Sequence, residues 1–276
     1  MYEAFYGLSQ KPFLMRPDAE YLYLSKGHQA ALSMLEYVFM SQSGFAVITG
    51  EIGSGKTSLV RKLLKNSDSS LVVGIVNNTR VESYTEFLQW ILLGFDIDFA
   101  GAETSAPRLH KLLSDFLKQQ HIQQKRPILI IDEAHNLDAE MIEQLRMLSN
   151  LNVDKMDLLQ LVLVGQSRLR ETLADDSLLP FVHRVAVDCH LEPLDLDETH
   201  AYIRHRLMVA GAQHEIFTNA SIPSIWEASR GIPRIINLLC DTALLFGFAE
   251  QLSTIGDDLI HDVINDKRQS LSPIAV

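Results

Sequence analysis

Residues 44–57, GFAVITGEIGSGKT, contain the two features that decide the fold. The first half is an apolar run of the kind that forms a buried strand. The second half, residues 50–57, fits the spacing G-x-x-x-x-G-K-[ST], whose backbone N–H groups surround phosphate in many proteins. A helical pattern, TSLVRKLL, follows at once. We therefore expect a phosphate-binding loop at the carboxyl end of a buried strand.

Within this loop, Lys56 is expected to reach the β and γ phosphates, and the Thr57 hydroxyl is expected to hold magnesium. The alternative is an ordinary glycine-rich turn, which the flanking strand and helix disfavour. The residues expected to bind the nucleotide are Gly50, Glu51, Ile52, Gly53, Ser54, Gly55, Lys56, Thr57 and Ser58.

Outward from the loop, apolar runs with strand character alternate with helical patterns. After 44–50, the runs are 71–77, 128–132, 159–165 and 184–191. Alternating strands and helices favour an α/β fold with a five-stranded parallel sheet covered by helices on both faces. After about residue 192 only helical patterns remain, and Asp195 and Glu198 have the spacing of a capping box.

The sequence thus predicts three regions. Residues 1–43 form an arm rich in aromatic residues and proline, with a first helix, and belong to the α/β core. Residues 44–192 form the α/β domain, and residues 193–276 form a helical domain. Whether this aromatic arm also contributes to a pocket for the base of the nucleotide stays open.

Two acids follow the third strand in ILIIDEAH, residues 128–135. Ligands of α/β sheets bind where parallel strands end, so Asp132 and Glu133 are expected at the same edge as the loop. We expect Asp132 to support magnesium and Glu133 to act as the base for, or to orient, the attacking water. For His135, a structural and a catalytic role both remain open.

An arginine near the start of an apolar helix stands out in GIPRIINLLCD, residues 231–241. Pro233 suits the first helical turn, and Arg234 follows it. A cation is poorly matched to the positive end of a helix dipole, so helix stability does not explain Arg234. Either an anion outside the helix or a snorkelling surface arginine would account for it.

Composition places the chain among ordinary globular proteins, with 47% hydrophobic and 21% charged residues. The net charge of -11 disfavours a broad nucleic-acid-binding surface but leaves room for a local basic patch. No apolar run approaches the roughly 20 residues of a membrane span, and the start lacks a signal-peptide layout, so we expect a cytoplasmic location. Cys189 and Cys240 lie in apolar segments and are expected in the core.

Taken in order, six segments resemble the AAA+ ATPases, and within them the general secretion pathway protein A group with its exosortase-associated relatives. The order of all six is more specific than any one of them. The segments are FYGLSQKPF with RPDAEYLYLS, GFAVITGEIGSGKT, ILIIDEAHNL, LVLVGQSRLRETL, LEPLDLDETHAYIRHRL and GIPRIINLLCDTALL.

The resemblance implies an AAA+ P-loop NTPase fold and roles for three polar residues. Gln166 matches a sensor of the γ-phosphate, although asparagine or threonine is more usual there. Arg184 matches an arginine presented to a neighbouring subunit's nucleotide. Arg234 matches an arginine of the helical lid that contacts the γ-phosphate of its own subunit. For the role in trans, Arg146, Arg168 and Arg170 are competing candidates.

The implied activity is hydrolysis of ATP with Mg²⁺ in a homo-oligomer, driving assembly or operation of a bacterial envelope machine for secretion, pilus assembly or polysaccharide export. An inner-membrane or envelope-assembly partner is implied, because many members continue into a membrane span and a periplasmic part. The sequence to residue 276 contains neither, so three alternatives stay open: a short member of the group, a cytoplasmic fragment, or a protein that works through a separate membrane partner. A peripheral position at the inner membrane would then come through that partner or through a missing C-terminal extension. Two other functions stay open: an ATP-dependent DNA transposition helper, and a nucleotide-gated scaffold with slow turnover.

Overall fold

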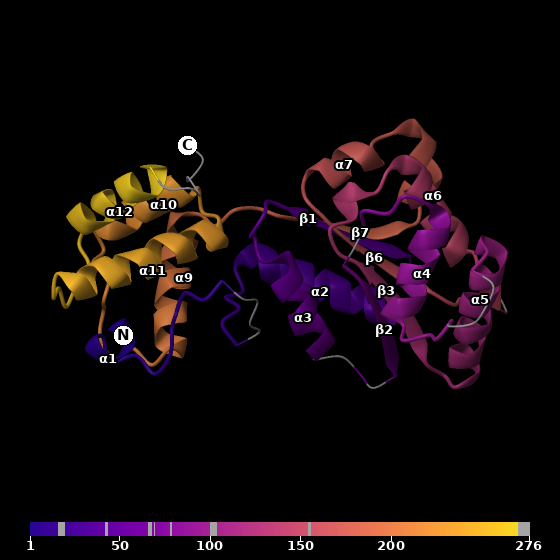
Figure 1. The fold of residues 1–276 in the computed structure, drawn as a ribbon, viewed down its shortest axis with the longest axis horizontal. Helices are drawn as coiled ribbons and strands as arrows, with labels where there is room; N and C mark the ends of the chain where they lie inside the picture. The colour runs from indigo at the N-terminus through magenta and orange to yellow at the C-terminus, as the bar shows by residue number, and fades with distance from the viewer. Residues whose placement is uncertain are drawn as a thin grey trace. The chain divides into compact units, whose positions relative to one another are not determined.

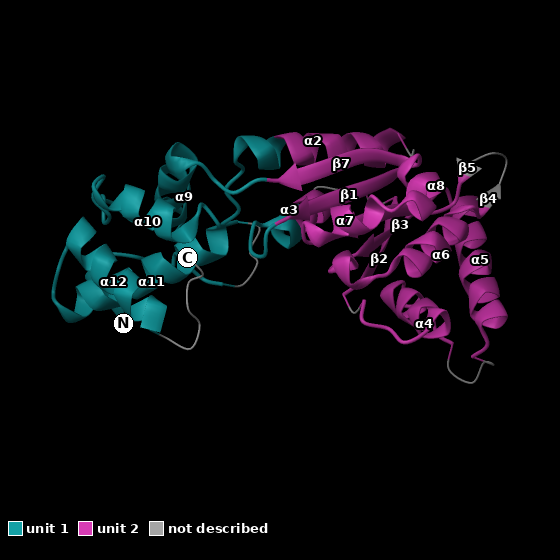
Figure 2. Ribbon diagram, turned by 90° about the horizontal axis from the view of Figure 1, so that it is seen from above, with its two compact units in different colours: residues 1–29, 51–59, 192–276 teal, residues 30–50, 60–191 magenta. Residues whose placement is uncertain are grey.

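The computed structural model describes residues 1–15, 20–41, 44–65, 68, 70–77, 79–99, 104–153 and 156–269. The chain divides into two compact units (Figure 2). Unit 1 contains residues 1–29, 51–59 and 192–276, and unit 2 contains residues 30–50 and 60–191.

A parallel sheet of five strands is the centre of unit 2, with helices around it (Figure 1). The strand order is β2-β3-β6-β1-β7. This confirms the expected five-stranded α/β fold, and all five predicted runs lie in the sheet. Their bounds are β1 Phe45–Gly50, β2 Leu71–Val76, β3 Arg126–Ile131, β6 Gln160–Val164 and β7 Val185–Leu191.

Strand burial follows the position of each strand in the sheet. Every residue of β1 and β6 is buried, as is every residue of β3 after Arg126. These are the interior strands, which neighbours and helices cover on all sides, and they read as continuous apolar runs for that reason. The edge strands β2 and β7 mix buried with exposed residues.

The helices of unit 2 pack on this sheet and share its core, which includes Phe45, Phe87 and Phe181. A short antiparallel pair, β4 Asn152–Val153 and β5 Met156–Asp157, was not expected from the sequence. The helical segments are α4 Tyr84–Gly94, α5 Ala106–Ile122, η1 Ala134–Asn136, α6 Ala139–Ser149, α7 Arg168–Leu173, η2 Asp176–Leu178 and α8 Leu179–Val182.

Unit 1 is helical, as expected for the C-terminal region. Asp195 and Glu198 form the predicted capping box at the start of α9 (Leu196–Val209), and Pro233 lies in the first turn of α11 (Pro233–Ala249). Two helices, α2 Lys26–Ser41 and α3 Lys56–Lys65, begin in unit 1 and continue into unit 2. The other helices of unit 1 are α1 Tyr2–Phe5, α9 Leu196–Val209, α10 Ser221–Ser229, α11 Pro233–Ala249 and α12 Asp257–Gln269.

The aromatic arm packs with the helices of unit 1, whereas we expected it with the α/β core. Tyr2, Tyr6 and Phe13 are buried in the same cluster as residues of α9, α10, α11 and α12. Arg206 of α9 binds the arm, because its Nε donates a hydrogen bond to the Pro12 carbonyl at 2.6 Å. The reason for the difference is that aromatic side chains without periodicity indicate burial but do not indicate against which partner. The three domain boundaries themselves stay a prediction.

Both cysteines are buried free thiols, as predicted. Burial raises the pKa of the Cys189 thiol to about 11. Because the thiolate is the reactive form, this shift disfavours reaction of the Cys189 thiol at neutral pH.

Candidate functional site

The phosphate loop leaves β1 at Gly50 and enters α3 at Lys56, as the sequence predicts. The Glu51 carbonyl accepts two hydrogen bonds, from the Ser54 backbone N–H at 3.1 Å and from the Lys56 ammonium at 2.8 Å. The loop is therefore closed into a turn by its own residues. A bound phosphate would compete with the Glu51 carbonyl for the Lys56 ammonium.

Two glycines of the loop are required by their neighbours. Gly53 has a φ of +84°, and a Cβ there would overlap the side chain of Arg234. Gly55 has a φ of +103°, and a Cβ there would lie 2.8 Å from Nε2 of His28. Both backbone conformations favour glycine. The loop is thus closely approached by α11 on one residue and by α2 on another.

Arg234 contacts the loop through its backbone, since its N–H donates to the Gly53 carbonyl at 3.3 Å. Its side chain is exposed. Within the described residues, its guanidinium has no hydrogen bond or ion pair. The arginine predicted to act on phosphate therefore lies next to the predicted phosphate loop, within unit 1.

Asp132 and Glu133 follow β3 directly, at the carboxyl edge of the sheet of unit 2. The Asp132 N–H continues the ladder to the carbonyl of Val76 at 2.9 Å, and its carboxylate accepts from the Glu133 N–H at 2.9 Å. Glu133 has a left-handed backbone with a φ of +54°. For a residue other than glycine this conformation costs about 1 kcal/mol or more, so its surroundings must hold it.

Thr79 and Asn136 hold this strained turn. The Thr79 hydroxyl donates to the Glu133 carbonyl at 2.8 Å, and Nδ2 of Asn136 donates to the Thr79 hydroxyl at 3.2 Å. Thr79 is 2% exposed, whereas Glu133 and Asn136 are exposed, so these bonds are partly buried. Neither residue was singled out from the sequence. The available signal was that Thr79 follows the end of β2, at the same sheet edge as the acids.

His135 lies between the acid and the expected sensor. Its Nδ1 is 3.3 Å from Oε2 of Glu133 and 3.4 Å from the backbone nitrogen of Gln166. A protonated Nδ1 donates to the carboxylate, whereas an unprotonated Nδ1 accepts from the Gln166 N–H, so it serves one partner at a time. His135 therefore contacts both the Glu133 carboxylate and the backbone N–H of Gln166.

Gln166 follows Gly165, whose N–H donates to the carbonyl of Ile48 in β1 at 2.9 Å. Gln166 is thus at the carboxyl edge of the sheet, between the ends of β3 and β1. This is the same edge at which Asp132 and Glu133 lie and at which β1 leads into the phosphate loop.

Arg184 precedes β7 and is bound within its own unit. Its Nη1 donates to the Ser149 hydroxyl at 2.7 Å, its Nη2 lies 3.7 Å from Asp157, and its guanidinium lies 5.4 Å from the centre of the Phe45 ring. These contacts give Arg184 a structural role in this chain. Its expected role towards a neighbouring subunit stays a prediction.

The competing arginines differ in their partners. Arg146 forms a two-pronged contact with Glu143, and Arg170 pairs with Asp188 at 2.5 Å. Arg168, at the start of α7, is exposed, and its side chain has no partner among the described residues. Arg168 is therefore the one of these three that could turn to another molecule without losing an ion pair seen here.

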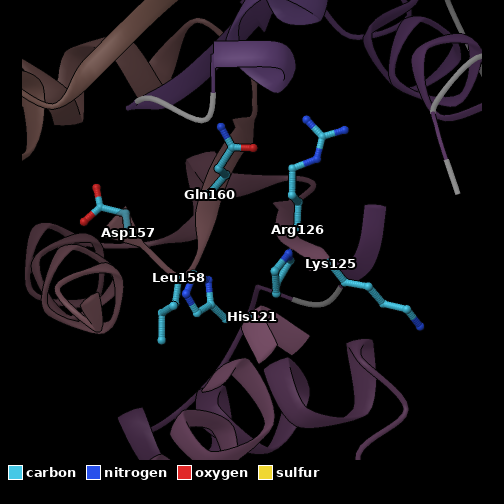
Figure 3. A pocket seen from close by; sticks show the side chains of 7 residues that line it. His121, Lys125, Arg126, Asp157, Leu158 and Gln160 are labelled. Atoms are coloured by element: carbon cyan, nitrogen blue, oxygen red, sulfur yellow. The ribbon is translucent and has the colours of Figure 1, made fainter. Parts of the chain in front are cut away.

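The pocket in Figure 3 lies elsewhere in unit 2, where β3 and β6 begin. Its volume of about 30 Å³ suits a few water molecules and excludes a nucleotide. Nε2 of Gln160 donates to the Val38 carbonyl at 3.0 Å, while its buried Oε1 has no hydrogen-bond partner among the described residues. Water in the pocket would satisfy that oxygen. The residues around it are His121, Lys125, Arg126, Pro127, Asp157, Leu158 and Gln160.

Comparison with known proteins agrees with this fold. Residues 40–173 match the family model described as AAA domain. Together with the sheet order and the phosphate-loop sequence, this match defines a domain with the AAA+ P-loop fold.

The chain is related to general secretion pathway protein A of Aeromonas hydrophila. The two are 37% identical over 249 residues, which are 90% of this chain and 45% of the relative. The chain therefore spans about half the length of the curated relative that it matches.

Solved structures show the same fold at low sequence identity. Cdc6p of Pyrobaculum aerophilum has a TM-score of 0.73 at 18% identity, covering 90% of this chain and 70% of its own. The Aeropyrum pernix ORC1 protein in complex with DNA has a TM-score of 0.69 at 16% identity, covering 94% and 70%. The Thermotoga maritima RuvB Holliday junction branch migration motor has a TM-score of 0.59 at 18% identity, covering 90% and 71%.

Among the described residues, none of the helices has the length and apolar character that crossing a membrane requires.

Proposed function

We propose that this protein is a Mg²⁺-dependent ATPase that binds ATP through the phosphate loop. The observation that supports this most directly is the contact of Arg234 with Gly53. An exposed arginine without a partner among the described residues lies against a loop whose sequence suits phosphate. Electrostatic attraction for a polyphosphate is the simplest reason for both features.

The roles of the other residues follow from their chemistry. Lys56 would leave the Glu51 carbonyl and bind the β and γ phosphates. Glu133 would orient the attacking water, with Thr79 holding its backbone. Gln166 and Arg234 would offset charge that builds on the γ-phosphate. These residues would act by positioning the reactants and by stabilising charge, and the protein itself would take little part in covalent chemistry.

The donor set fits magnesium. The Thr57 hydroxyl and the Asp132 carboxylate offer hard oxygen ligands, which Mg²⁺ prefers. The described residues contain no cluster of three His, Cys, Asp or Glu side chains suited to a metal. Mg²⁺ is usually held by one or two protein ligands together with phosphates and water, so the Thr57 hydroxyl and the Asp132 carboxylate would be sufficient in number. When bound, Mg²⁺ would neutralise charge on the β and γ phosphate oxygens.

We further propose that hydrolysis drives assembly or operation of a bacterial envelope machine for secretion, pilus assembly or polysaccharide export. The 37% sequence identity to general secretion pathway protein A of Aeromonas hydrophila supports this function. The protein would act as a homo-oligomer on the cytoplasmic side of the inner membrane, attached through a partner protein. An arginine supplied in trans, Arg184 or Arg168, would complete each active site.

A second candidate function is an ATP-dependent DNA transposition helper. On α5 the exposed Arg108, Lys111 and Lys118 are the cations that such a function could use, but exposed Asp115 interrupts them and the net charge of -11 weighs against this function. Salt-sensitive retention on DNA would support this function. A nucleotide-gated scaffold would bind ATP and turn it over slowly, although an intact Glu133 favours hydrolysis.

The experiment that tests the proposal is ATP hydrolysis per subunit over a wide range of protein concentration, with and without Mg²⁺. We expect Mg²⁺-dependent activity that rises with concentration, because subunits complete each other's sites. Activity that is independent of concentration would contradict the role in trans. Nucleotide binding without hydrolysis would favour the scaffold, and absence of binding would refute the ATPase proposal.

A further inference from the structure

His28, at the start of α2, is a buried polar residue that the proposed mechanism leaves unused. Its exposed fraction is 3%. Its Nδ1 lies 2.7 Å from the Ser25 hydroxyl, and its Nε2 lies 3.0 Å from the Ser54 carbonyl of the phosphate loop. Both ring nitrogens are therefore engaged, and one of them contacts the loop directly.

The partners determine which nitrogen carries the proton. A carbonyl oxygen can only accept, so Nε2 must carry a hydrogen and donate to Ser54. In the neutral ring Nδ1 is then an acceptor, so the Ser25 hydroxyl donates to it. Burial lowers the pKa of His28, which keeps the ring neutral at physiological pH.

The position of the ring is fixed from the helix. The Ser25 hydroxyl also accepts from the backbone N–H of His28 at 3.3 Å, as a helix-capping serine does. The next residue, Lys26, donates its N–H to Oε1 of Glu198 at 3.1 Å, and Glu198 belongs to the capping box of α9. Residues 25–28 therefore connect the phosphate loop to α9 within unit 1.

The contact also sets the direction of a loop peptide. In a planar trans peptide the carbonyl and the N–H point in opposite directions. Because His28 holds the Ser54 carbonyl, the N–H of Gly55 points away from His28. On the neighbouring residue, the Gly53 carbonyl is held by the Arg234 N–H. Two successive carbonyls of the loop are thus held by α2 and α11.

We propose that His28 is a positioning residue that holds the phosphate loop in the conformation that receives phosphate, with Ser25 fixing its tautomer. The part of this inference that concerns nucleotide rests on the proposed function. The part that concerns loop order does not, because it depends only on the hydrogen bond between His28 and the Ser54 carbonyl.

The test compares His28→Leu, which keeps an apolar volume without a donor, with His28→Gln, whose amide keeps a donor. The first readout is hydrogen exchange of the amides of residues 51–57 in nucleotide-free protein. The second is the dissociation constant for MgATP. We expect exchange about fivefold faster and MgATP binding about fivefold weaker in His28→Leu, the effect of one neutral hydrogen bond. His28→Gln should stay within about twofold of the natural protein.

A third variant, Ser25→Gly, covers the case in which His28→Leu does not fold. Glycine is tolerated at the start of a helix, so this change removes the hydroxyl from His28 and keeps most of the cap. It should shift both readouts in the same direction as His28→Leu. Equal exchange and equal affinity in all variants would overturn the inference. If the natural protein binds no MgATP, the ATPase proposal fails, and the exchange comparison alone decides the role of His28.

Discussion

The Thr79 hydroxyl donates a 2.8 Å hydrogen bond to the carbonyl of Glu133, across 54 residues of sequence. Glu133 has a left-handed backbone, and this bond is one of the contacts that stabilise it. The expected base or water-orienting residue is therefore held by a residue from the neighbouring strand segment.

Thr79→Val removes the hydroxyl and keeps the shape of the side chain. We expect a loss of about 1 kcal/mol in the free energy of unfolding, because the partly buried hydrogen bonds of the Thr79 hydroxyl with the Glu133 carbonyl and the Asn136 amide are lost. ATP turnover should fall with it, since Glu133 is less well placed. Denaturant unfolding and steady-state hydrolysis measure both effects. Thr79→Ser keeps the hydroxyl and is the control; equal turnover in the two variants would contradict the positioning role.

Glu133→Gln tests the chemical step separately from binding. The amide keeps the size of the side chain but cannot act as a base, so turnover should fall by about 100-fold or more. The affinity for MgATP, measured by calorimetry, should be retained. Lys56→Ala, in contrast, should abolish nucleotide binding or hydrolysis. If Glu133→Gln lost binding instead, Glu133 would have a structural role.

Gly53→Ala should weaken nucleotide binding, because a Cβ at this position overlaps Arg234 and the φ of +84° is unfavourable for alanine. We expect a loss of at least about 1 kcal/mol in binding, or roughly fivefold in the dissociation constant. Gly27→Ala, in α2, is the matched control: the nearest atom to its Cβ would be the Ser25 hydroxyl oxygen at 3.8 Å. That change should leave binding unaffected and stabilise the helix by up to about 1 kcal/mol. Similar affinities in both variants would argue against close packing of Arg234 on the loop.

Arg184→Ala and Arg168→Ala separate a structural arginine from one that acts in trans. Arg184→Ala should cost about 1–3 kcal/mol of stability, since the contacts to Ser149 and Phe45 are lost, whereas Arg168→Ala should cost less than about 0.5 kcal/mol. Each variant is then mixed with Lys56→Ala protein. If the substituted arginine acts in trans, hydrolysis should partly recover in the mixture. Some sites between subunits then combine Lys56 from one protein with the intact arginine from the other. No recovery at any ratio for either arginine would count against both candidates.

The sequence predicted those parts of the molecule that depend on local patterns. Continuous apolar runs predicted the interior strands, and spacing alone predicted the capping box of Asp195 with Glu198. The contacts of Thr79 and His28 could not be predicted in this way. Their partners lie 54 and 26 residues away, and only the folded chain brings them together. Direct tests of the predicted site roles are the variants proposed above.

Stability should fall as the pH drops below about 6.5, because two histidines of unit 1 are held neutral in the folded protein. Burial lowers the pKa of His28, and burial followed by the nearby charge of Arg206 lowers the pKa of His205. The unfolded chain therefore binds more protons than the folded one once the pH falls through the ordinary histidine value of 6.5. This contribution to stability is complete above that value and is lost as the pH falls through the folded-state pKa values.

Thermal unfolding between pH 5 and 8 measures this dependence. His28→Gln and His205→Gln should each flatten the decline below pH 6.5, because each removes one proton-binding group whose affinity differs between the two states. His214 is exposed, and His214→Gln is the control, with a profile parallel to that of the natural protein. If thermal stability declined equally steeply with falling pH in His28→Gln and in His214→Gln, the acid sensitivity would come from groups other than His28.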